Sequence, residues 1–161
     1  SENLGGKALA FLGAREVRTT AGVAIGGGKN FPANDGELAA WYAARESKTS
    51  RERLRVLLER YGTGADAVLE ALGGSETMLE HTNELSCQEL AYMAKHEQVG
   101  RLIDVFIRRT NLAFRGLVTK NLVIEAANCL ADPMEWDKSQ IQAEIDHSLS
   151  VLAEAHGVTL V

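Results

Sequence analysis

Residues 86–110, SCQELAYMAKHEQVGRLIDVFIRRT, predict two successive helices. Ser86 and Glu89 have the spacing of a capping box, in which a hydroxyl and a carboxylate each accept a backbone N–H at the start of a helix. Behind this start, apolar residues recur at helical spacing: Leu90, Met93 and Ala94, then Val99, Leu102, Ile103 and Phe106. The stretch therefore favours an α-helical domain.

The sequence on both sides of this stretch repeats the same signals. Thr49 with Glu52 and Asp137 with Gln140 have the spacing of two further capping boxes, and Asp35 can cap another helix. Helical periodicity follows these signals at 54–61, 65–72, 117–130 and 141–156. We therefore expect an all-α fold, a bundle of about six helices preceded by a glycine-rich extended segment.

The beginning of the chain has a different character. Residues 4–12 predict a short helical piece, whereas Gly26, Gly27, Gly28 and Pro32 are typical of a loop. We expect residues 1–33 to be a linker together with the end of a preceding domain. Residues 34–161 then form the helical domain.

Composition excludes several classes of function. A net charge of −5 argues against a general nucleic-acid binder, which needs a surplus of basic residues to match phosphates. No run approaches the roughly 18 apolar residues of a membrane span, and no signal pattern marks the chain for export. Cys87 and Cys129 lie far apart without a CxxC motif, so we expect free thiols in a reducing cytoplasm.

The glycine triplet before Lys29 does not match a nucleotide-binding motif. A Walker loop requires glycine where Val23 stands and a hydroxyl residue where Asn30 stands. A GxGxxG fingerprint starting at Gly26 requires glycine at Phe31. The sequence therefore predicts no cofactor-binding residues in this loop.

The remaining reactive side chains also lack the spacing that chemistry requires. His96-Glu97 begins like a zinc-protease HExxH motif, but Gly100 stands where the second histidine belongs. The helix start predicted at Ser86 would lower the pKa of Cys87, yet no base is recognisable beside it. We expect no catalytic and no metal-binding residues in the chain.

Arg108-Arg109-Thr110 is the most informative polar cluster, because it closes the second predicted helix of the stretch 86–110. Cations at a helix C-terminus are favoured by the helix dipole alone. Arginine also forms planar, bidentate contacts with carboxylates or phosphates. Three roles stay open: a buried or interdomain structural role, exposed capping, and direct contact with a substrate.

The string ELAYMAKHE at residues 89–97, followed by Arg108-Arg109-Thr110, resembles the C-terminal helical domain of FAD-dependent glycerol-3-phosphate dehydrogenases and alpha-glycerophosphate oxidases. In that family a helix with a His-Glu pair leads into a helix that ends in Arg-Arg-Thr. Three further stretches resemble family features: the inter-helix turn at Arg60-Tyr61-Gly62-Thr63, the loop leaving the flavin domain at Thr20 and Gly26–Gly28, and the last flavin-domain helix at 8–12.

The resemblance implies a fragment that is structural and non-catalytic by itself. The parent enzyme would oxidise glycerol 3-phosphate to dihydroxyacetone phosphate, with electrons passing to FAD and then to quinone or oxygen. FAD would be held by the preceding flavin-binding domain, which is the expected partner; a homodimer of the parent is a further assembly left open. The parent would be peripheral on the cytoplasmic face of the membrane. The candidate interdomain or structural residues are His96, Glu97, Arg108, Arg109 and Thr110.

Two other readings compete with this one. An independent helical protein-interaction or regulatory module would have a self-contained front end and a specific protein partner. A small stand-alone enzyme would depend on Cys87 or on the histidines.

Overall fold

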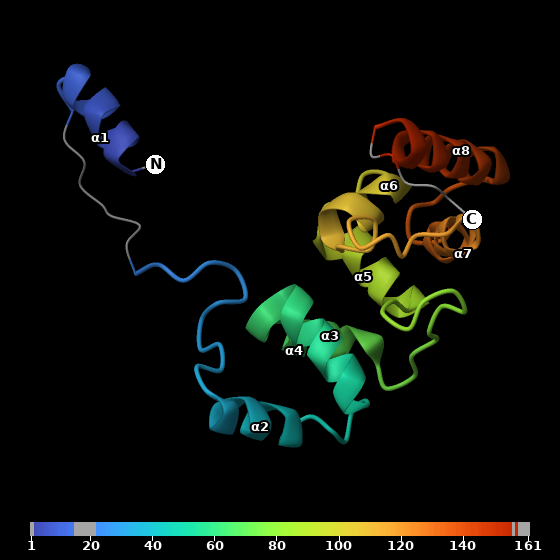
Figure 1. Ribbon diagram of the computed structural model, residues 1–161, viewed down its shortest axis with the longest axis horizontal. Helices are drawn as coiled ribbons and strands as arrows, with labels where there is room; N and C mark the ends of the chain where they lie inside the picture. Colours follow the sequence, from blue (N-terminus) through green and yellow to red (C-terminus); the bar gives the residue numbers. More distant parts are fainter. Residues whose placement is uncertain (1, 15–21, 156, 158–161) are drawn as a thin grey trace.

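The computed structural model describes residues 2–14, 22–155 and 157. Within these ranges the all-α prediction is confirmed (Figure 1), since β structure is limited to one isolated bridge between Met78 and Ser86. None of the helices described there combines the length and the hydropathy needed to cross a membrane. The elements are α1 (Glu2–Phe11), α2 (Asp35–Ala43), α3 (Arg51–Tyr61), the 3-10 turn η1 (Gly62–Gly64), α4 (Ala65–Leu72), α5 (Cys87–His96), α6 (Leu102–Asp104), the π-helical turn η2 (Val105–Arg109), α7 (Lys120–Leu130) and α8 (Lys138–Glu154).

Two hydrophobic clusters organise the helices that follow α1. The first cluster joins α2, α3 and α4 and contains Trp41, Leu57 and Leu69. The second joins α5 to α8 around fully buried Phe106. Figure 1 shows the same grouping, with α2 to α4 beside one another and α5 to α8 in a second group. Tyr61, at the end of α3, packs against both clusters and therefore marks their junction.

One predicted capping box is confirmed in full and a second in part. Asp137 and Gln140 form a reciprocal capping box, in which each side chain accepts the other residue's backbone N–H at 2.8 Å. Ser86 accepts the backbone N–H of Glu89 at 3.1 Å. The carboxylate of Glu89 does not return to Ser86, however, so only half of that predicted box forms.

Two other predicted caps are wrong by one residue. Helix α3 is capped by Ser50, which accepts from the backbone N–H of Arg53, and not by Thr49. Helix α2 is capped by Asn34 and not by Asp35. In both places a second good cap stands next to the predicted one, and the backbone selects the neighbour that is extended.

The helix expected to run to Phe106 is short and irregular. After one α turn (α6) the chain widens into η2, and the backbone N–H and hydroxyl of Thr110 both donate to the Val105 carbonyl, at 2.9 and 2.8 Å. This five-residue spacing is that of a π turn. It ends the helix at Arg109 and gives the buried Thr110 hydroxyl a partner.

Helix α7 begins later than predicted. Its cap is Thr119, whose hydroxyl accepts the backbone N–H of Leu122 at 3.1 Å, so Leu117 lies in the preceding loop. The inner face of this helix is packed against its neighbours, because five of its residues have no exposed surface: Leu122, Val123, Ala126, Ala127 and Leu130.

The expectation of free thiols is wrong. Cys87 and Cys129 form a disulfide, with Cα atoms 5.1 Å apart. Cys87 is the first residue of α5, and Cys129 lies in the last turn of α7; these two helices pack against each other. The pairing spans 42 residues of sequence, so spacing alone did not reveal it.

The leading loop, residues 22–29, is fixed to the turn that follows α3. The Gly27 carbonyl accepts the backbone N–H of Thr63 at 2.9 Å, and the Thr63 hydroxyl donates to the Lys29 carbonyl at 2.9 Å. Gly27 and Gly62 both have positive φ, at 74° and 58°. A Cβ on Gly62 would clash with the backbone of Gly27, and a Cβ on Gly27 would clash with the Tyr61 carbonyl. The contact therefore requires glycine on both sides.

We predict that Gly62→Ala lowers the free energy of unfolding by about 1–3 kcal/mol, because its Cβ separates the two backbones and strains the left-handed conformation. Gly64→Ala is the matched control, since Gly64 has φ −65° and its Cβ would meet only the Tyr61 Cβ at 3.9 Å. The control should stay within about 1 kcal/mol of wild type. Urea unfolding measures both variants, and equal losses would contradict the backbone contact.

Candidate functional site

The structure places a carboxylate with no exposed surface between the two hydrophobic clusters. Glu89 lies in the first turn of α5, and its exposed fraction is 0%. Its carboxylate accepts from Arg53 Nη2 and Arg60 Nη1, each at 2.5 Å, and from the Tyr61 hydroxyl at 2.9 Å. The positive end of the helix dipole favours an anion at this position. Glu89 thus ties α5 to three side chains of α3.

Arg53 also connects Glu89 to the segment that precedes α5. Its guanidinium, only 5% exposed, donates to Glu76 at 2.6 Å and to the Glu84 carbonyl at 2.8 Å. Burial lowers the pKa of Arg53, but the bonds and charges of Glu76 and Glu89 outweigh it, so the pKa is raised overall. Arg53 is therefore a permanent buried cation, and its hydrogen-bond acceptors are the carboxylates of Glu76 and Glu89 and the Glu84 carbonyl.

Glu84 forms the outer end of the network. Its carboxylate accepts from Arg115 Nη1 at 2.7 and 2.9 Å and lies 3.9 Å from Arg60 Nη2. Arg60 also donates to the Glu84 backbone carbonyl at 3.2 Å. We call the whole set the ion network; its members are Arg53, Arg60, Tyr61, Glu76, Glu84, Glu89 and Arg115. Its three cations balance its three anions, so the network is neutral.

Tyr61 supplies the uncharged donor of the ion network. Burial raises the pKa of Tyr61, and the charge and hydrogen bond of Glu89 raise it further. The phenol therefore stays protonated and serves as a hydrogen-bond donor. Its ring packs edge-on against Tyr92, with centroids 6.0 Å apart, so the same residue also contributes to the apolar junction.

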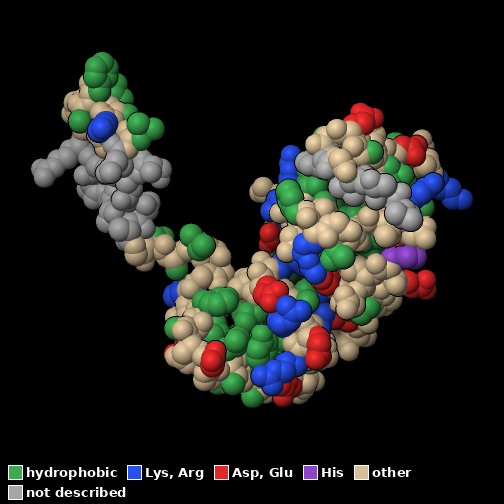
Figure 2. All heavy atoms as spheres, viewed as in Figure 1, with side chains coloured by type: hydrophobic (Ala, Val, Ile, Leu, Met, Phe, Trp, Pro, Cys, Tyr) green, Lys and Arg blue, Asp and Glu red, His purple; other side chains and the backbone are tan. Residues whose placement is uncertain are grey.

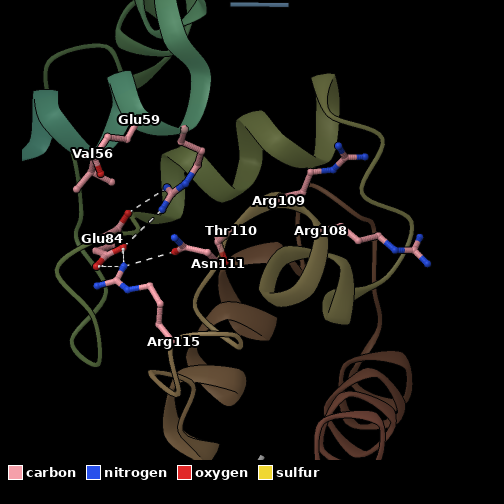
Figure 3. Close-up of a pocket in the computed structure, with 9 residues that line it drawn as sticks. Val56, Glu59, Glu84, Arg108, Arg109, Thr110, Asn111 and Arg115 are labelled. Carbon is pink, nitrogen blue, oxygen red and sulfur yellow. Dashed lines mark hydrogen bonds and ion pairs between the residues drawn. The ribbon is translucent and has the colours of Figure 1, made fainter. Parts of the chain in front are cut away.

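A pocket of about 220 Å³ opens beside the ion network, between α3 and the segment 108–115 (Figure 3). Arg115 and Glu84 are directed towards each other there, whereas Arg108 and Arg109 point away from them. The arginines at the inner wall are already paired with carboxylates. The pocket is consequently a polar cleft whose charges are largely satisfied by the chain itself.

The five residues singled out from the sequence lie close along the chain but face different partners. His96 ends α5, is exposed, and stacks on Tyr92 with ring centroids 4.7 Å apart. Arg108 is 67% exposed and pairs with Asp104 at 3.1 Å. Thr110 is buried against Val105, as described above. The side chain that contacts His96 is therefore Tyr92, and not its sequence neighbour Glu97.

Glu97 and Arg109 are the two predicted residues that do meet. Glu97 caps the end of α5, and its carboxylate lies 3.9 Å from Arg109 Nη1. The Arg109 Nε is buried and has no hydrogen-bond partner among the described residues. Among the five predicted residues, only Arg109 has a buried donor without a hydrogen-bond partner.

The ion network itself was missed from the sequence. Glu89 was interpreted as the second half of a capping box, which accounts for its position but not for its burial. A usable signal existed, since Arg53 and Arg60 are seven residues apart and so lie on one side of α3, next to its apolar stripe. This placement allows both guanidinium groups to reach one acceptor on a neighbouring helix, which the structure shows to be Glu89.

The leading loop does not fit the pyrophosphate of a flavin dinucleotide. Such a site needs glycines that lead directly into a helix N-terminus. Helix α2 starts only at Asp35, and the Gly28 backbone N–H already donates to the Ile25 carbonyl at 2.8 Å. Within the described residues, no group of three or more His, Cys, Asp or Glu side chains is arranged to hold a metal ion.

We predict that Glu89→Gln lowers the free energy of unfolding by about 3 kcal/mol or more, because Arg53 and Arg60 lose a shared counter-charge in a buried site. Glu59→Gln is the control, since the Arg55–Glu59 pair is 60% and 63% exposed. It should cost no more than about 0.5 kcal/mol. The midpoint of urea unfolding at constant m-value distinguishes the two. A Glu89 variant as stable as the control would show that the network contributes little.

Comparison with known proteins agrees with the resemblance seen in the sequence. The family model described as the C-terminal domain of alpha-glycerophosphate oxidase matches residues 18–141. No curated protein and no solved structure matches the chain. The matched range includes both glycines of the loop contact, the whole ion network and all five predicted residues. The chain therefore belongs to the family of alpha-glycerophosphate oxidase C-terminal domains.

Proposed function

We propose that this chain is the helical cap domain of an FAD-dependent glycerol-3-phosphate dehydrogenase. The parent enzyme oxidises glycerol 3-phosphate to dihydroxyacetone phosphate and passes the electrons through FAD to quinone or oxygen. The cap is structural and does not itself catalyse the reaction. Residues 1–33 are the linker together with the end of the flavin-binding domain, and residues 34–161 are the helical cap. The family match over residues 18–141 carries this proposal.

The chemistry of the ion network supports a structural role. Its buried charges are paired within the chain, and the Tyr61 hydroxyl donates to Glu89. A catalytic acid or base needs a reacting atom within hydrogen-bond reach and a proton that it can give or take. Glu89 has no exposed surface through which a substrate could reach it. The network is therefore suited to holding α3 and α5 in one arrangement.

The exposed apolar residues of α1, together with Leu12 directly after it, support a connection to another body. Leu4, Phe11 and Leu12 are 75%, 91% and 76% exposed. Figure 1 shows α1 apart from the other helices, and Figure 2 shows apolar side chains on its surface. A short helix that buries so little is marginal in water, because packing supplies most helical stability. Helix α1 is accordingly suited to pack on the flavin domain.

The five predicted residues have interdomain or structural roles in this proposal. Arg109, whose side chain is 32% exposed, and exposed His96 are the members that a neighbouring domain can still contact. Arg108 pairs with Asp104 on its own helix, and the buried Thr110 closes η2. The parent is peripheral on the cytoplasmic face of the membrane, attached through the flavin domain.

The proposal predicts that this chain acts on the flavin domain when the two are supplied separately. The chain is mixed with the separately expressed flavin domain loaded with FAD, and glycerol-3-phosphate-dependent dye reduction is measured, with each piece alone as a control. We expect the chain alone to be colourless and inactive. It should bind the flavin domain and raise its activity or its melting temperature.

A chain that neither binds nor stabilises the flavin domain would contradict the cap assignment. If that chain instead captured a specific other protein, the independent interaction module would be the better explanation. Dye reduction by the chain alone would point to the stand-alone enzyme.

A further inference from the structure

The leading loop presents apolar side chains from a rigidly held backbone. Val23 and Ile25 are 67% and 82% exposed, although the loop is fixed at Gly27 by its contact with Tyr61 and Thr63. A free loop would usually turn such side chains away from water. This loop is held by the backbone contact at Gly27, two residues after Ile25. Apolar groups that a fold holds out in this way are typical of an interaction surface.

A row of aromatic rings continues this surface from the loop to the end of α5. The backbone of Gly27 lies against Tyr61, the Tyr61 ring packs on Tyr92, and the Tyr92 ring stacks on exposed His96. Glu97 and Arg109 follow directly, with the Arg109 Nε still lacking an acceptor. Loop and rings are therefore linked through Tyr61, and we call the exposed residues on either side of this link the junction face; it comprises Val23, Ile25, Tyr92, His96 and Arg109.

The length of the connection limits what can cover the junction face. The family match begins at residue 18, nine positions before the fixed Gly27. Nine residues span at most about 30 Å when fully extended. The flavin domain of the proposed parent, joined to the cap through this part of the chain, is therefore tethered near Gly27. A tethered body has a high effective concentration at nearby surfaces, which favours the junction face over more distant patches.

We infer that the junction face is the surface on which the preceding flavin domain of the parent packs. The inference rests on the proposed function and specifies the side of the cap that meets its partner. Val23 and Ile25 supply the apolar part, and Tyr92 with His96 adds two aromatic rings whose centroids lie 4.7 Å apart. Arg109, whose side chain is 32% exposed beside Glu97, adds a cation at the edge of this face. Aromatic residues and arginine are also the side chains that contribute most at protein interfaces.

The test measures binding of the FAD-loaded flavin domain to this chain by calorimetric titration, with flavin absorbance as a check that the partner is folded. Ile25→Asp and His96→Asp place a charge on the junction face. Phe114→Asp is the matched control, because Phe114 is 75% exposed but lies on the separate loop before α7. All three positions are exposed, and thermal unfolding of each variant confirms that it folds as the wild type does.

We expect Ile25→Asp and His96→Asp each to raise Kd by tenfold or more, while Phe114→Asp binds as the wild type does. A wild-type chain that binds, with either junction variant within threefold of it, would overturn the inference and leave the proposed function intact. A loss of binding in Phe114→Asp alone would overturn it as well. A wild-type chain that does not bind would overturn the proposed function, and the inference with it.

Discussion

The carboxylate of Glu89 has no exposed surface, and the arrangement of the domain follows from that constraint. A buried charge without partners is far too costly to persist, so donors must converge on it. Here the donors are Arg53, Arg60 and Tyr61, all from α3, whereas Glu89 belongs to α5. Hydrogen bonds are directional, so they define the orientation of α3 relative to α5. Apolar contacts are non-directional and specify this orientation less precisely. The two hydrophobic clusters therefore meet at a specified angle.

The same constraint explains why the charges extend beyond one pair. Arg53 and Arg60 bring two positive charges to a single carboxylate, and Glu76 and Glu84 compensate for the excess. Arg115 then neutralises the second of these carboxylates at the surface. The network thus extends from the buried pair Arg53–Glu89 to Arg115, whose side chain is exposed to water. A neutral and fully bonded assembly of this kind suits a joint between two cores better than it suits acid–base chemistry.

Local signals predicted the helices, and long-range pairing accounts for what they missed. Asp137 and Gln140 lie three residues apart, so their reciprocal bonds could be recognised from the sequence alone. Glu89 satisfies the same rule at its backbone, yet its carboxylate binds Arg53, 36 residues away. The disulfide depends in the same way on α5 packing against α7. The π turn was missed for a different reason, because it depends on whether Thr110 bonds to Val105 or to a nearer carbonyl.

Four consecutive residues link the ion network to the leading loop. Arg60 and Tyr61 donate to Glu89, while Gly62 and Thr63 receive the backbone of Gly27. The side chains of this turn thus define how the two clusters meet, and its backbone defines where the preceding chain joins them. A shift of α3 relative to α5 would move the leading loop as well. In the two-domain enzyme proposed above, this turn would link the packing of α3 on α5 to the orientation of the cap on the flavin domain.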